Sequence, residues 1–168
     1  MNNPIILHTV RFVLLVLAQV FVFNNINLFG YINPSVYLLF LILFPVKVNR
    51  SLFLFLGFLL GLTMDFFNNT GGIHAAACLL AAYARPLLLK YSFGVSYEYN
   101  TIKIDQTPMG GRLSYITSIV VIHHLLLYFL EVFNLRHTLF ILKSTFLSSI
   151  FTILMVLVIM ILFSKKQR

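Results

Sequence analysis

Charged residues are scarce in this chain of 168 residues, and acidic residues are the scarcest of all. Only 10% of the residues are charged, whereas 60% are hydrophobic, and the mean hydropathy is +0.96. A soluble domain carries about a quarter charged residues, so this chain has too little polar surface to cover a water-soluble globule. The composition predicts an all-α integral membrane protein, and no linker or shift of composition divides it into more than one domain.

Cysteine and the usual catalytic motifs are almost absent. Cys78 is the only cysteine, which excludes an intramolecular disulfide and a cysteine-rich metal site. His123 and His124 are adjacent, whereas a helical metal pair is separated by three or four positions. The sequence also contains no phosphate-binding glycine loop and no GxSxG turn. We therefore expect no catalytic centre, no metal and no cofactor.

Because only four residues are acidic, the net charge is +8. The Lys and Arg residues lie in short clusters between apolar runs. That distribution is typical of membrane orientation, whereas a nucleic-acid-binding face needs many cations on one surface. The expected surroundings are therefore a lipid bilayer, with no nucleic acid as partner.

Apolar runs predict a compact bundle of about six transmembrane helices, at residues 5–23, 34–46, 51–64, 73–89, 113–133 and 139–163. Crossing the hydrocarbon core takes about 20 residues, and the second and third runs are shorter. Either they thin the bilayer or they form a hairpin that neighbouring helices shield. A count of five or four spans stays open. Pro86 is expected to kink or end the fourth helix.

Positive charge predicts the orientation, because Lys and Arg favour the cytoplasmic side. With six spans and a cytoplasmic amino terminus, most cations fall inside: Lys47, Arg50, Lys90, Lys103, Arg112, Lys165, Lys166 and Arg168. Both termini are then cytoplasmic, as is the loop 90–112. That loop is either an interfacial loop or, from its alternation over 93–99, a small hairpin that meets a partner.

Gly57, Gly61 and Asp65 are four residues apart and share one face of the third helix. Two glycines at this spacing allow close packing of helices in a membrane. An acidic residue at membrane depth tends to mark a function. Alternatively, Asp65 is structural and accepts hydrogen bonds from the turn at 68–72 or the start of the fourth helix.

Three further charged residues are predicted to lie on the outer side with Asp65: Glu131, Arg136 and Lys143. Our hypothesis is that Asp65 or Glu131 pairs with Arg136 or Lys143, which would lock the fifth and sixth helices to the third. For Arg11 and Arg85, near the inner ends of their helices, we expect long side chains that snorkel to the headgroups.

The run from Gly57 to Asp65, with Gly71, Gly72 and an alanine-rich helix up to Tyr83, resembles the rod-shape-determining protein MreD family. That family is recognised by a Gly-Leu-x-x-Asp segment followed by a glycine that opens an apolar helix. The matching positions are Gly61, Leu62, Asp65 and Gly72.

The resemblance implies a non-enzymatic scaffold of the cell-elongation machinery in a bacterial cytoplasmic membrane. The direct partner would be a single-span MreC protein, which acts with a glycosyltransferase, a penicillin-binding transpeptidase and the MreB filament. Candidates for its interface are the Gly57–Gly61 face and the small-residue faces of the fourth and sixth helices. The implied six-helix fold is related to the substrate-binding subunits of energy-coupling-factor vitamin transporters. The alternative function is therefore a small-molecule-binding subunit of such a transporter, with ligand groups among Asp65, Asn68, Asn69, His74 and Glu131.

Overall fold

The computed structural model describes residues 4–26, 32–94, 104 and 107–163. These residues form helices, turns and loops, with no β-sheet among them, in agreement with the all-α prediction. The six α-helices are α1 (Pro4–Phe21), α2 (Leu39–Leu43), α3 (Arg50–Asn68), α4 (Ile73–Phe93), α5 (Met109–Val132) and α6 (Thr138–Phe163). Short 3-10 turns occupy Phe23–Asn25, Val36–Leu38 and Leu135–His137.

Five of these helices, all except α2, are long and apolar enough to cross a membrane. The chain is therefore of the multi-pass membrane type. The second apolar run, 34–46, is not one helix: α2 has only five residues and follows the 3-10 turn Val36–Leu38. We call residues 32–44 the broken segment, and its residues are nearly all buried.

The other helices extend beyond the apolar runs of the sequence. The third run stops at residue 64, but α3 continues to Asn68 and ends because Asn69 adopts a left-handed conformation with φ of 54°. Similarly, α4 passes through Pro86 and ends at Phe93, before Gly94 with φ of 75°. Pro86 therefore does not terminate the helix.

The broken segment returns across the bundle beside α1. At one end, the Gln19 side chain bonds the carbonyl of Pro34, and at the other the rings of His8 and Phe44 lie 4.9 Å apart. Gln19 and His8 are eleven residues apart on α1, which corresponds to about 16 Å along the helix axis. The segment thus covers roughly half of a hydrocarbon core of about 30 Å.

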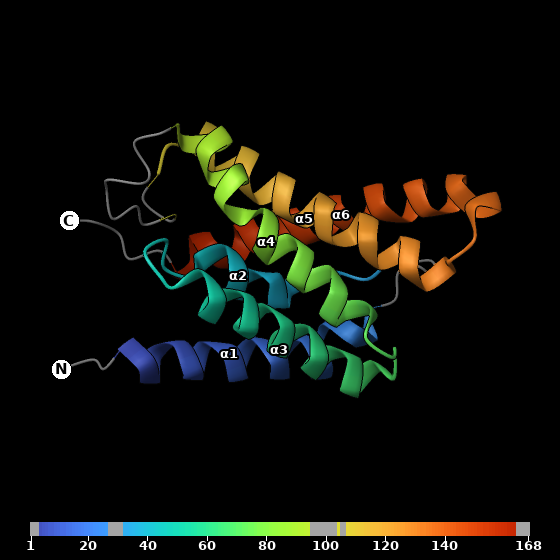
Figure 1. The fold of residues 1–168 in the computed structure, drawn as a ribbon, viewed down its shortest axis with the longest axis horizontal. Coiled ribbons are helices and arrows are strands. Elements are labelled where there is room, and N and C mark those ends of the chain that lie inside the picture. The colour runs from blue at the N-terminus through green and yellow to red at the C-terminus, as the bar shows by residue number, and fades with distance from the viewer. Residues whose placement is uncertain (1–3, 27–31, 95–103, 105–106, 164–168) are drawn as a thin grey trace.

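The helices alternate in direction, as Figure 1 shows: α1, α3 and α5 run from left to right, and α4 and α6 run back. With the broken segment as a further return, the start of α1 and the end of α6 lie at the same end of the bundle. We call this left-hand end the basic end. It carries six of the eight described Lys and Arg residues: Arg11, Lys47, Arg50, Arg85, Lys90 and Arg112.

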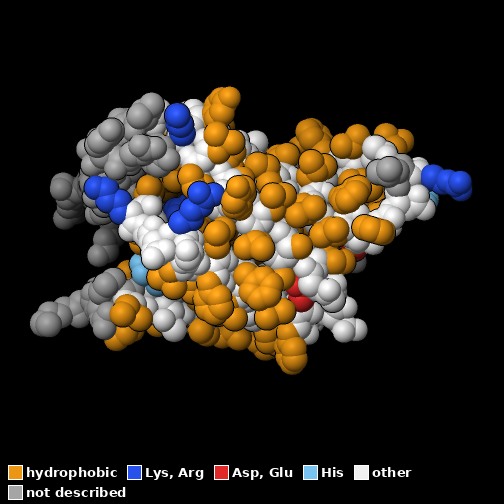
Figure 2. Space-filling view, in the orientation of Figure 1, with side chains coloured by type: hydrophobic (Ala, Val, Ile, Leu, Met, Phe, Trp, Pro, Cys, Tyr) orange, Lys and Arg blue, Asp and Glu red, His pale blue; other side chains and the backbone are white. Residues whose placement is uncertain are grey.

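The opposite end, which we call the acidic end, carries both described acidic residues. Asp65 lies near the end of α3 and Glu131 near the end of α5, with Arg136 and Lys143 as the remaining cations. Figure 2 shows Lys and Arg side chains gathered at the left and a broad hydrophobic surface between the two ends.

The α3–α4 hairpin is closely packed. A Cβ atom at Gly57 would lie 3.0 Å from the Cβ of Ala82, and one at Gly61 would lie 2.5 Å from the Cα of Ala75. Real Cβ atoms essentially never approach another heavy atom to 2.5 Å, and a contact of 3.0 Å is tighter than nine in ten. The glycine spacing in α3 is therefore used inside the molecule, to bring α4 against it.

Candidate functional site

The backbone of the broken segment is held by side chains from α1 and α6. Gln19 Oε1 accepts from the N–H of Val36 at 2.8 Å, and Gln19 Nε2 donates to the Pro34 carbonyl at 2.9 Å. Thr152 Oγ1 accepts from the N–H of Ser35 at 3.0 Å. Irregular backbone at membrane depth is tolerated only where protein groups satisfy it. Gln19 and Thr152 provide that satisfaction.

A second set of polar contacts leads from Gln19 towards the acidic end. Gln19 Nε2 donates to Asn24 Oδ1 at 3.0 Å, and Asn24 Nδ2 donates to Asn68 Oδ1 at 2.7 Å. Asn68 Nδ2 lies 3.3 Å from His74 Nε2. These contacts join α1, the turn after it, α3 and α4 through half-buried side chains.

The chain of contacts continues into the core through a tyrosine between two histidines. The Tyr37 hydroxyl lies 2.8 Å from His74 Nδ1 and 3.0 Å from His123 Nε2. On the next residue, His124 Nε2 lies 3.4 Å from Thr152 Oγ1. His123 and His124 are completely buried. Together these contacts form one network, which we call the polar network: Gln19, Asn24, Tyr37, Asn68, His74, His123, His124 and Thr152.

The polar network is a candidate functional feature that the sequence does not predict. In the sequence, His123 and His124 raise only the question of a metal pair, and nothing relates Gln19 to Thr152. Polar side chains inside apolar runs are costly in a membrane and need partners, so the sequence does indicate which polar residues are important. Their partners lie far away in the sequence, so the sequence does not indicate which of these residues bind each other.

Asp65 has the structural role that was one of its two expected alternatives. Its Oδ1 accepts from Thr70 Oγ1 at 2.5 Å and from the N–H of His74 at 2.9 Å, and Oδ2 accepts from the N–H of Ala75 at 2.8 Å. The N–H groups of His74 and Ala75 belong to the first turn of α4, where they have no acceptor within the helix. Gly72 precedes that turn with φ of 103°, a conformation that favours glycine. The carboxylate therefore caps α4 from α3.

The other predicted outer residues lie on a different connection. Glu131 is at the end of α5, Arg136 is in the turn Leu135–His137, and Lys143 is in the second turn of α6. The hydrogen bonds of Asp65 described above all stay within the α3–α4 hairpin. Pairing of Asp65 or Glu131 with these cations stays a prediction.

Arg85 does not snorkel, so that expectation is wrong. Its side chain is buried and donates from Nε to the Tyr115 hydroxyl at 2.8 Å and from Nη1 to the Pro45 carbonyl at 3.2 Å. Nη2 donates to the carbonyl of Phe44, and the guanidinium lies over the ring of Phe53. Arg85 thus binds the carbonyl groups at the end of the broken segment, which have no helical partner.

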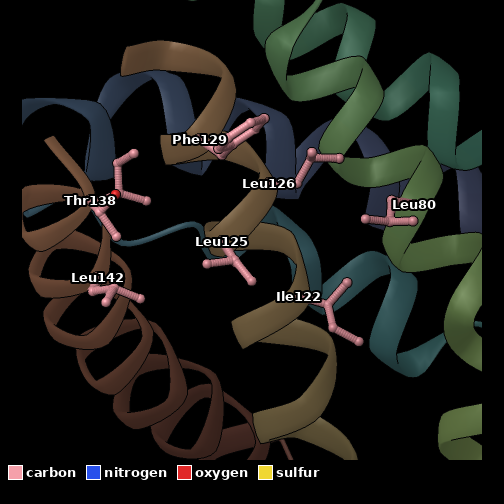
Figure 3. A pocket seen from close by; sticks show the side chains of 8 residues that line it. Leu80, Ile122, Leu125, Leu126, Phe129, Thr138 and Leu142 are labelled. Atoms are coloured by element: carbon pink, nitrogen blue, oxygen red, sulfur yellow. The ribbon is translucent and has the colours of Figure 1, made fainter. Parts of the chain in front are cut away.

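A groove opens on the membrane-facing surface between α4 and α6. Its volume is about 460 Å³, its floor is α5, and Leu80 of α4 forms one wall. Figure 3 shows the α5 side chains between Leu80 and the α6 residues Thr138 and Leu142. Thr138 is the only polar residue in the lining, which consists of Leu80, Ile122, Leu125, Leu126, Phe129, Thr138, Ile141 and Leu142. We call this hollow the α5 groove.

Comparison with known protein families, with curated proteins and with solved structures finds no match for the chain. Within the described residues, no three His, Cys, Asp or Glu side chains are grouped so that they could hold a metal ion. The function is therefore inferred from the polar network, the α3–α4 hairpin and the α5 groove.

Proposed function

We propose that the chain is a non-enzymatic scaffold of the bacterial cell-elongation complex, of the MreD kind, that binds a single-span MreC-like protein. The proposal rests on one observation: the segment that resembles the MreD family folds as a single structural element. Gly61 allows α4 to approach, Asp65 caps its first turn, and Gly72 opens it. The segment through which the chain resembles that family thus makes one element, the α3–α4 hairpin.

The partner would bind at the α5 groove and not at the Gly57–Gly61 face. That glycine face is already covered by α4, so the partner-facing surface must lie elsewhere. The α5 groove presents apolar side chains to the bilayer along three helices. Because lipid gives helices little hydrophobic drive to associate, van der Waals contact decides where they pack. A helix lying in a groove makes more such contact than one on a convex face.

Through that partner the scaffold would act on the glycosyltransferase, the penicillin-binding transpeptidase and the MreB filament, and so direct peptidoglycan synthesis and cell shape. The proposed location is the bacterial cytoplasmic membrane. The basic end would face the cytoplasm, because Lys and Arg favour that side. The start of α1 and the end of α6 would then both be cytoplasmic.

The alternative, a small-molecule-binding subunit of a vitamin-type transporter, has one observation in its favour. Asn68 and His74, two of its predicted ligand groups, come together near the acidic end. Their polar atoms bind each other and the rest of the polar network, however, and Glu131 lies on another hairpin. The kinship with energy-coupling-factor subunits remains part of this proposal.

Site-specific crosslinking in native membranes tests the scaffold proposal. A photo-crosslinking amino acid is placed at Leu125 in the α5 groove and, as a matched control, at Val13 on α1. The two side chains are 43% and 46% exposed, so a difference in yield reports position and not access. We expect a crosslink to a single-span MreC-like protein from Leu125 alone.

Equal yields of that crosslink from Leu125 and Val13 would place the partner elsewhere than in the groove. Crosslinks to ATPase subunits, together with a vitamin found by mass spectrometry in the purified protein, would support the transporter alternative and refute the scaffold.

A further inference from the structure

The hydrogen bonds that lead from Gln19 to His74 have only one consistent direction. Gln19 Oε1 accepts from two backbone N–H groups, those of Val36 at 2.8 Å and Tyr37 at 3.3 Å. Turning the amide around would place its NH₂ group against both donors. Gln19 Nε2 must therefore be the donor to Asn24 Oδ1. The backbone thus fixes the first bond of the chain.

Each following bond takes its direction from the one before. Asn24 donates with Nδ2, so Asn68 accepts with Oδ1 and donates with Nδ2 to His74 Nε2. Since Nε2 of His74 is an acceptor, the ring is neutral and carries its proton on Nδ1. That proton is donated to the Tyr37 hydroxyl, which also lies within hydrogen-bond distance of His123 Nε2.

We propose that His74 makes the polar network an acid-sensitive latch between α4 and the broken segment. A protonated imidazole donates from both nitrogens, so His74 Nε2–H would then face the NH₂ group of Asn68. Asn68 and Asn24 could accept it only by turning their amides, and the fixed amide of Gln19 blocks that rotation. Acid therefore breaks the chain of bonds at His74.

The groups that face His74 allow the charge to form once the latch opens. Asp65 of α3 accepts from the backbone N–H of His74 and is the acidic group that faces it. Tyr37 lies on the side of the broken segment, and His123 and His124 of α5 lie beyond it. Asn24, Asn68 and His74 are half-buried at the acidic end, so protons reach the latch from that side of the membrane.

Linkage gives the sign of the effect. The closed network requires a neutral His74 and so binds one proton fewer than the opened network. The closed state is therefore stable at neutral pH and loses stability as the pH falls through the range in which histidine titrates. This latch is independent of the scaffold function, since it needs no partner protein.

Cys78 supplies a reporter for the latch. It is the only cysteine of the chain, it is fully buried, and it lies one turn along α4 from His74. Its protection is the rate of thiol modification in unfolded protein divided by the rate in folded protein, both measured at the same pH. That ratio removes the intrinsic pH dependence of thiol reactivity.

The experiment measures Cys78 protection in the full chain in lipid nanodiscs at about pH 7.5 and about pH 5.5. We expect the protection to fall about tenfold, because the His74 ring is in contact with water only in the opened state, where one unit below the usual histidine pKa of about 6.5 leaves about one neutral ring in eleven. Asn68→Asp should abolish this fall, since a carboxylate accepts from both Asn24 and the imidazolium. His137→Gln, which removes an exposed histidine of the acidic end, should behave as the unmodified chain does.

Unchanged protection of the unmodified chain at the lower pH would overturn the proposal. So would a full acid-induced fall in Asn68→Asp. If Asn68→Asp does not fold, His74→Gln decides: it cannot titrate, so its protection should be the same at both pH values, and a tenfold fall would refute the latch.

Discussion

The α3–α4 hairpin and the broken segment are both buried, but different interactions hold them. The hairpin is held by contacts between neighbours in the sequence: glycines that admit the backbone of α4, and an aspartate that caps it. The broken segment is held by polar side chains from α1, α4 and α6. Close packing makes the first region intolerant of added volume, whereas hydrogen bonding makes the second intolerant of lost polar atoms.

The largest expected effect is on the hairpin, from Gly61→Leu. Ordinary overpacking costs about 1–3 kcal/mol, and here the added atoms meet the backbone of α4, which cannot move aside. We expect a loss of more than about 3 kcal/mol in the free energy of unfolding, measured in mixed micelles. Gly110→Leu is the control, because a Cβ at Gly110 meets nothing within 4 Å. Similar losses in the two variants would contradict the packing account.

Arg85→Leu should be the most damaging change to the broken segment. It leaves the carbonyl groups of Phe44 and Pro45 and the Tyr115 hydroxyl without their donor. At about 1–3 kcal/mol for each unsatisfied buried group, a loss of about 3 kcal/mol is expected in the same unfolding measurement. Lys90→Leu, which removes an exposed cation from the same helix, should cost far less. Equal losses of free energy of unfolding in Arg85→Leu and Lys90→Leu would mean that the positive charge, and not the hydrogen bonds, stabilises the fold.

Gln19→Leu should cost about 2 kcal/mol, since it leaves the N–H groups of Val36 and Tyr37 unpaired. Asn25→Ala is the matched control. The Asn25 amide is exposed and makes only a local bond to the carbonyl of Phe21, so its removal should change the free energy of unfolding by a few tenths of a kcal/mol. If Gln19→Leu leaves the free energy of unfolding unchanged, the polar network does not stabilise the fold.

The smallest effect is expected from Thr152→Val, which removes the acceptor of the Ser35 N–H and the more distant contact to His124 Nε2, and should cost about 1 kcal/mol. Ser149→Ala sharpens the test, because the Ser149 hydroxyl is buried on the same helix and has no hydrogen-bond partner among the residues that the structure describes. Its removal should be neutral or stabilising. Thr152→Val keeps the number of side-chain heavy atoms, whereas Ser149→Ala removes one. If hydrogen bonding decides, Thr152→Val should nevertheless lose more free energy of unfolding than Ser149→Ala. The reverse order would contradict the account.

The hairpin could be predicted from the sequence because its determinants are local. The spacing of four residues places Gly57, Gly61 and Asp65 on one face of the helix. A capping role for Asp65 was one expected alternative. The broken segment could not be predicted, because residues 34–46 are as apolar as a helix. Its shape is decided by Gln19, 15 to 18 residues away in the sequence, and by Arg85 and Thr152, which are 40 and 117 residues from the groups that they bind. Their partners are backbone groups, which no residue type reveals.

Amide hydrogen exchange of the broken segment tests most directly whether remote side chains hold it. The N–H groups of Ser35, Val36 and Tyr37 should be protected in the unmodified chain. In Gln19→Leu, protection should fall at Val36 and Tyr37 while the α3–α4 hairpin keeps its own. Exchange that is already fast at these three amides in the unmodified chain, or that rises equally throughout the bundle in the variant, would contradict the account.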